Sequence, residues 1–165
     1  RIGKKNTFML SGIVCAILSI LFFFLPAEQI ELIFIINILI GIFSAMAFPL
    51  IWAMYGDVSD YSELKTRRRA TGLIFSSSSM SQKLGWTIGG AISGWILAAF
   101  GFIANEVQSD ESVLGIRLMI SIFAAVGVLI SIAIMYFYPL TEKFMKEKVE
   151  GPLEEARAKY NETKI

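Results

Sequence analysis

Four long apolar runs, separated by short polar segments, dominate the pattern of residues along this chain. The runs cover residues 7–25, 32–55, 73–100 and 113–138. Each run is close to or above the roughly 20 residues that a helix needs to cross the hydrocarbon of a bilayer. Transmembrane β-strands would be shorter and would alternate in polarity, which these runs do not. The pattern therefore predicts an all-α membrane protein with four transmembrane helices.

The basic residues gather on one side of the expected spans. They precede the first run, lie between the second and third, and follow the fourth, whereas the connections 26–31 and 101–112 contain none. The positive-inside rule then places both termini and the middle connection in the cytoplasm. Arg117 lies alone near the opposite face, where we expect an interfacial residue with Glu111 or Glu106 as candidate partners. Residues 141–165 mix both signs of charge and are expected to form a solvated cytoplasmic tail.

One charge interrupts the third run. Lys83 lies about ten residues inside it, at a depth where insertion of a charge costs roughly 3 kcal/mol or more. Helical spacing places Lys83 on roughly one face with Ser76, Ser79, Trp86, Thr87 and Gly90. Such a face is expected to look into a bundle or a watery cavity rather than into lipid. Lys83 is therefore a candidate for a substrate or ion pathway, or for a structural ion pair.

Pro49 lies inside the second run and predicts a kink near residues 45–48, because proline removes a helical hydrogen bond. A kink near the middle of the membrane frees backbone groups, and transporters often place binding sites there. A kink that only shapes packing is the alternative, and the sequence leaves both open.

The middle connection, residues 57–72, carries a dense set of charges. Asp57, Asp60 and Glu63 recur at three-residue spacing, which places them on one side of a continuing helix. The bases that follow are Lys65, Arg67, Arg68 and Arg69. Tyr61 supplies an apolar anchor in the same segment. A cluster of salt bridges that clasps the helices is one interpretation, and a solvated loop that only sets topology is the other.

Several classes of function lack the residues they need. The sequence has no histidine and a single cysteine, Cys15, so it offers neither a disulfide framework nor a zinc site. No metal site, cofactor or nucleic-acid partner is expected for this segment. The chain begins at Arg1 without a methionine, which is typical of the middle of a longer protein.

The middle connection also carries a family signature. The run Asp60-Tyr-x-Glu-x-Lys-Thr, followed by Arg69-x-x-Gly72, resembles the cytoplasmic loop of the glycoside–pentoside–hexuronide:cation symporters. These are melibiose-carrier-like members of the major facilitator superfamily. Lys83 falls at the position of the family's intramembrane lysine. The stretches 108–117 and 138–143 are similar to the family's last outer loop and the end of its last helix.

The resemblance implies a fold and an activity. Residues 1–140 would be helices nine to twelve of a twelve-helix carrier, followed by the tail 141–165. The carrier would couple a sugar or glycoside to Na⁺ or H⁺ by alternating access. Its expected partners are membrane lipid, the small substrate and the missing amino-terminal helices. Those helices would supply carboxylates for Lys83, which would lie near the cation site.

The resemblance also assigns roles to residues of this chain. Candidates for the substrate cavity are Phe48, Trp52, Ser79, Gln82 and Thr87. Candidates for the cytoplasmic gate are Asp57, Asp60, Tyr61, Glu63, Lys65 and Arg69. Phe48 stands where the melibiose carrier has an indole, so it can offer an apolar platform without an N–H donor. Trp52, one turn later, is either a substitute for that indole or a packing residue.

Two other hypotheses belong to different classes. A small four-helix membrane module could assemble through the Gly-x-x-x-Gly spacings of the third run, at Gly85, Gly89, Gly90 and Gly94. A membrane enzyme could use Ser79 and Lys83 as nucleophile and base. The module lacks an acid at depth to meet Lys83, and the sequence shows no other catalytic constellation. We therefore expect a transporter segment and not an enzyme.

Overall fold

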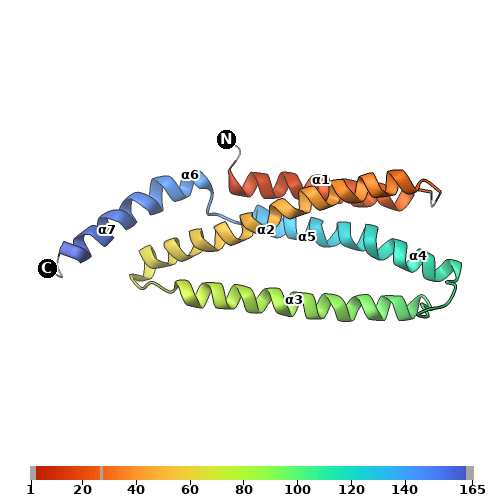
Figure 1. Cartoon of the computed structure of the whole chain (residues 1–165). Coiled ribbons are helices and arrows are strands. Elements are labelled where there is room, and N and C mark those ends of the chain that lie inside the picture. The colour runs from red at the N-terminus through yellow and green to blue at the C-terminus, as the bar shows by residue number, and fades with distance from the viewer. Residues whose placement is uncertain (1–2, 27, 163–165) are drawn as a thin grey trace.

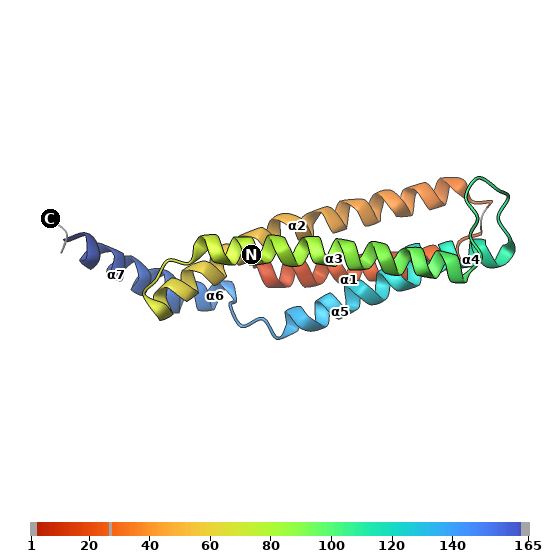
Figure 2. The ribbon, with the colours of Figure 1, turned by 90° about the horizontal axis from the view of Figure 1, so that it is seen from below.

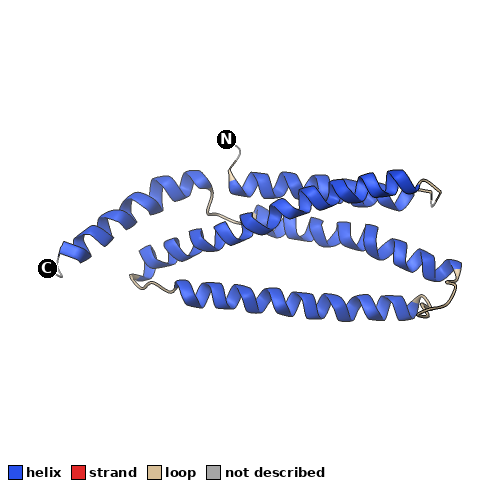
Figure 3. Ribbon diagram, in the orientation of Figure 1, coloured by secondary structure: helices blue, strands red, loops and turns tan. Residues whose placement is uncertain are grey.

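The computed structural model describes residues 3–26 and 28–162, and the side chains of this part as far as residue 158. Every regular element in it is helical (Figures 1 and 3), which confirms the predicted all-α fold. The long helices are α1 (Lys4–Phe24), α2 (Ile30–Thr66) and α3 (Thr71–Ala99). A fourth long helix consists of α4 (Asp110–Leu118), the π-helical η1 (Met119–Phe123) and α5 (Ala124–Tyr136). The tail forms α6 (Glu142–Met145), η2 (Lys146–Glu150) and α7 (Gly151–Glu162).

Three of the described helices are both long and apolar enough to cross a membrane: Lys4–Phe23, Ile30–Thr66 and Asp110–Tyr136. The helix α3 has the necessary length, with 29 residues, but the serines, Gln82 and Lys83 of its first half make it more polar. The third expected span, residues 73–100, is thus found as a helix. Its position across the membrane stays a prediction.

The helix α1 is the centre of the packing. It contacts α2 on one side and α5 on the other, and Figure 2 shows it between them. Its buried residues are Phe8, Ser11, Cys15, Ala16 and Ser19. The helix α3 has no buried residue, and Figure 1 shows it running beneath this layer, joined to it at its two ends. The described chain is therefore a layer of packed helices, formed by α2, α1 and α5, with α3 beside it.

The helix α2 is longer than its apolar run. It has 37 residues, well above the roughly 20 that span the hydrocarbon, so it is long enough for its charged last turns to extend beyond a membrane. Only residues 67–70 lie outside helices in the middle connection, and Arg67 ends α2 in the left-handed conformation at φ 53°. The expected middle loop is therefore mostly helix. Pro49 lies inside α2, whose ribbon bends along its length in Figures 1 and 2.

The turn between α3 and α4 depends on a close approach at Gly115. A Cβ atom there would lie 2.5 Å from Cγ of Phe100, at the end of α3. Gln108 organises the same turn: its amide nitrogen donates to the carbonyls of Ile103 and Glu106, at 2.6 and 2.8 Å. Ser109 caps α4 by accepting from the amide of Ser112 at 3.2 Å. The glycine thus lets α3 and α4 meet at this end.

We expect Gly115→Ala to destabilise the protein by about 1–3 kcal/mol, because the new methyl group must displace the Phe100 ring. The measurement is the thermal unfolding midpoint of the purified protein. Gly127→Ala is the matched control, since a Cβ at position 127 meets nothing within 4 Å. Equal unfolding midpoints for both variants and the wild type would show that Gly115 is not needed for this turn.

Candidate functional site

The lysine that the sequence predicts to lie within the membrane is on the exposed side of α3. Lys83 is exposed, and no carboxylate of the described residues lies within ion-pair distance of its ammonium group. Thr87, one turn later, donates its hydroxyl to the carbonyl of Lys83 at 3.0 Å. Ser79 and Gln82 are half-buried on the same helix. The structure therefore groups the predicted polar residues along α3 and leaves the role of each one a prediction.

An aromatic cluster joins the second half of α2 to the start of α3. Trp52 stacks on Phe75, with ring centroids 5.7 Å apart and an interplanar angle of 30°. Tyr55 meets both rings edge-on, at 5.7 and 6.3 Å. Phe48 approaches Trp52 at 6.0 Å and stays 53% exposed. Trp52 thus packs between two helices, whereas Phe48 keeps an open apolar face; neither contact tests substrate binding.

The start of α1 is tied to α2 and to the end of α5 by hydrogen bonds. The Lys4 ammonium donates to both carboxylate oxygens of Asp57, at 2.6 and 2.7 Å. Asp57 is largely shielded, with 15% of its side chain exposed. Lys5 donates to the carbonyls of Tyr136 and Tyr138, both at 2.8 Å, and so satisfies acceptors at the end of α5. Two adjacent lysines thus hold three helices together.

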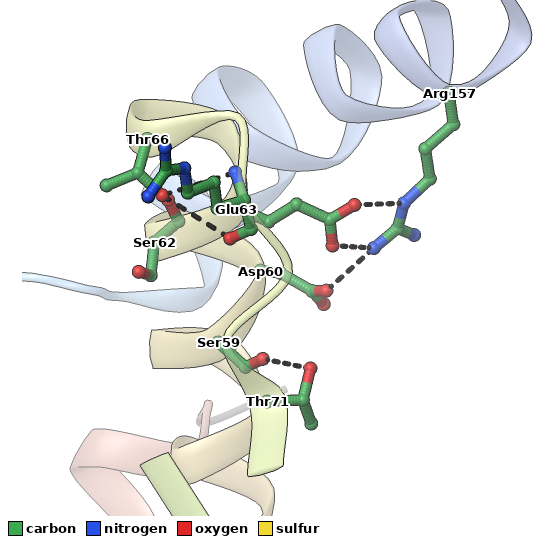
Figure 4. A network of polar contacts seen from close by, with 8 residues as sticks. Ser59, Asp60, Ser62, Glu63, Thr66, Thr71 and Arg157 are labelled. Atoms are coloured by element: carbon green, nitrogen blue, oxygen red, sulfur yellow. Dashed lines mark hydrogen bonds and ion pairs between the residues drawn. The ribbon is translucent and has the colours of Figure 1, made fainter. Parts of the chain in front are cut away.

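The last turns of α2 also bind the tail. Arg157 of α7 donates through Nη2 and Nε to the two carboxylate oxygens of Glu63, at 2.6 and 3.2 Å. The same Nη2 donates to Asp60 at 3.2 Å (Figure 4). The hydrogen bonds to Glu63 raise the pKa of the Arg157 guanidinium above its ordinary value, so this group stays charged. Asp60 and Glu63, two of the predicted gate acids, therefore share the guanidinium group of Arg157 from the tail.

An apolar cluster lies beside these ion pairs. Leu140, Met145 and Val149 form its buried part. Around it pack Val58, Tyr61, Leu64, Tyr138 and Phe144. Leu153, one turn beyond Val149, is also buried. The expectation of a solvated tail is wrong here: apolar residues at four-residue spacing form a stripe that docks on α2.

The predicted gate residues thus fall into two groups. Asp57, Asp60 and Glu63 lie on the last turns of α2 and all form ion pairs, and Tyr61 packs against Phe144 with ring centroids 6.0 Å apart. Lys65 and Arg69 are exposed and form no ion pair within the described part of the chain.

The bases that do pair with these acids were missed by sequence reasoning. They are Lys4 and Arg157, which lie 53 and 94–97 residues from their partners. For Arg157, the sequence offered one signal of a docked tail, namely the apolar residues Met145, Val149 and Leu153 at four-residue spacing. Arg157 follows four residues later on the same helix face. The hydroxyls of Ser59 and Thr71 also lie 2.8 Å apart across the short connection, as Figure 4 shows.

We expect two substitutions to release the docked tail to different extents. Val149→Asp should release it fully, because it buries a charge at a position with no exposed surface. Arg157→Gln should raise amide exchange in residues 142–158 by about fivefold at most, the range of an exposed ion pair. The measurement is hydrogen exchange of the purified protein.

Lys143→Gln is the matched control for these variants. Its side chain is 84% exposed and reaches Glu147 only at 3.9 Å, so the exchange rates should not change. Exchange in the tail that is identical in Val149→Asp and the wild type would contradict the docking of α7 on α2.

Known proteins resemble this chain over almost all of its length. The family described as MFS/sugar transport protein matches residues 1–142. A glucuronide carrier protein homolog of Escherichia coli (strain K12) is 36% identical over 149 residues, which cover 90% of this chain and 33% of that protein. The isoprimeverose transporter of Lactiplantibacillus pentosus is 34% identical over 163 residues, covering 98% of this chain and 33% of that protein. No solved structure matches the chain.

The chain spans about one third of the length of these relatives. A putative glycoside/cation symporter of Escherichia coli (strain K12) gives the same proportion, at 36% identity over 86% of this chain and 31% of the relative. The family is one of transporters and not of enzymes. The apolar helices and the match over most of the chain confirm the resemblance: this chain is part of an integral membrane protein and belongs to the glycoside–pentoside–hexuronide:cation symporter family of the major facilitator superfamily.

Proposed function

We propose that this chain is the carboxy-terminal third of a secondary transporter that couples a sugar or glycoside to Na⁺ or H⁺ by alternating access. The observation that carries the proposal is the polar face of α3, on which Lys83 meets no carboxylate of the described chain. The printed names of the relatives support a sugar or glycoside as the substrate.

The surroundings of α3 support the need for further helices. Its large apolar residues are open, with Trp86 69% and Trp95 73% exposed. A Cβ added at Gly85, Gly89, Gly90 or Gly94 would meet nothing within 4 Å. Small residues at this spacing permit close contact between helices in membranes. A helix with an open apolar side, an open glycine stripe and a lysine is suited to packing inside a larger bundle.

The chemistry of Lys83 gives a basis for coupling. An intramembrane ammonium group is stable when it pairs with carboxylates, which in this proposal come from the rest of the carrier. A cation that binds to the same carboxylates repels the ammonium group and changes the free-energy difference between the transport states. Ser79, Gln82 and Thr87 can hydrogen-bond sugar hydroxyls along the same helix, and Phe48 offers an exposed apolar surface on α2.

The charged end of α2 is suited to the cytoplasmic gate. Alternating access needs contacts that exist in one state and not in the other. Lys4 and Arg157 bind the gate acids within this chain, so α1, α2 and the tail are held together at this end. Lys65 and Arg69 remain exposed, and in this proposal they meet the other half of the carrier. Both termini lie in the cytoplasm, in agreement with the distribution of lysine and arginine.

Lys83→Ala in the complete carrier should abolish cation-coupled uptake, because the substitution leaves the partner carboxylates without the lysine ammonium group. Removing one member of a buried ion pair costs about 3–5 kcal/mol, so a loss of at least about a hundredfold is expected. The measurement is ion-driven uptake of radiolabelled glycosides into membrane vesicles, together with the amount of carrier in the membrane. Lys143→Ala, an exposed lysine of the tail, is the control and should transport normally. Undiminished coupled uptake by Lys83→Ala would rule out the role of this residue.

A further inference from the structure

An apolar pocket of about 240 Å³ lies at the end of the helices that is remote from the tail. Phe22 and Leu25 line it from the end of α1, and Ile33 from the start of α2. Val113, Ile116 and Ile120 line it from α4 and η1. The pocket is open rather than enclosed, since Val113 and Ile120 are each 50% exposed, and apolar surface of this kind is favourably buried against hydrocarbon. The pocket is therefore suited to a hydrocarbon group.

The remaining side chain of this pocket is a cation. Arg117 is half-buried, and its Nη2 donates to the carbonyl of Leu25. The guanidinium carbon lies 5.7 Å from the centroid of the Phe23 ring. The expected ion pair of Arg117 with Glu111 or Glu106 is absent from the described residues, none of which places a carboxylate within ion-pair distance.

An arginine at the edge of an apolar pocket has a defined binding preference. The guanidinium carries five N–H donors in a planar fork, and one of its nitrogens here binds Leu25. The other donors fit the oxygens of a phosphate group. We propose that the pocket binds one acyl chain of a membrane phospholipid and that Arg117 binds the phosphate of the same lipid.

The charges around the pocket select the headgroup. The segments next to it contain no lysine or arginine at residues 26–31 and 101–112. They do contain exposed acids near the lining residues: Glu28, Glu31, Asp110 and Glu111. Acids repel a lipid with net negative charge and attract an ammonium group. A phospholipid with an amine headgroup, phosphatidylethanolamine, matches this pattern of one cation among acids.

Native mass spectrometry of the purified protein, with equal amounts of phosphatidylethanolamine and phosphatidylglycerol, tests this site. The wild type should retain phosphatidylethanolamine in preference. Arg117→Gln should retain it about tenfold less, which corresponds to the loss of a charge-assisted hydrogen bond. Arg68→Gln, at an exposed arginine in the connection between α2 and α3, is the matched control and should bind as the wild type does.

A second variant separates the acyl chain from the phosphate. Val113→Phe fills the pocket without a change of charge and should lower retention of both lipids. Inorganic phosphate in millimolar excess should displace neither. Equal retention by Arg117→Gln and the wild type, a preference for phosphatidylglycerol, or displacement by inorganic phosphate would each overturn the proposal. The result does not depend on transport, so it stands or falls separately from the proposed function.

Discussion

The ammonium group of Lys83 is the main physical constraint on how α3 can pack. A charge within an apolar segment is stable only with a partner or with water, and the described chain supplies no carboxylate for it. The helix that carries it lies beside the packed layer of α1, α2 and α5 and has no buried residue. In the proposed carrier these helices are part of a larger bundle, and the chain spans one third of the length of its relatives.

Where the tail meets α2, in contrast to Lys83, the charged groups form ion pairs and the apolar side chains pack against one another. Burial of side chains such as Met145, Val149 and Leu153 contributes about 1.5–3 kcal/mol each, whereas an exposed ion pair contributes at most about 1 kcal/mol. The apolar stripe therefore provides most of the affinity of the tail for α2. Arg157 adds direction, because its planar guanidinium binds Glu63 through two nitrogens and fixes the rotation of α7.

The sequence was sufficient for the elements whose physics is local. Apolar runs of membrane-spanning length predicted the long helices, and the three-residue spacing of Asp57, Asp60 and Glu63 indicated that α2 continues past its apolar part. Contacts between distant segments could not be predicted from the sequence, because no local pattern joins Lys4 to Asp57, or Arg157 to Glu63. The tail was misjudged because mixed charges obscured an apolar repeat. The predicted cavity residues of α3 stay predictions because no contact among the described residues tests their roles.

The size of the native protein tests most directly whether this bundle is completed by the same polypeptide. Membranes of the source cell would be probed with an antibody against residues 141–165, and the mass of the labelled product would be measured. The account predicts a product about three times the 18.4 kDa of this chain, as the lengths of its relatives indicate. A product of 18.4 kDa would contradict it, and assembly of separate four-helix modules would then be the better explanation for the open face of α3.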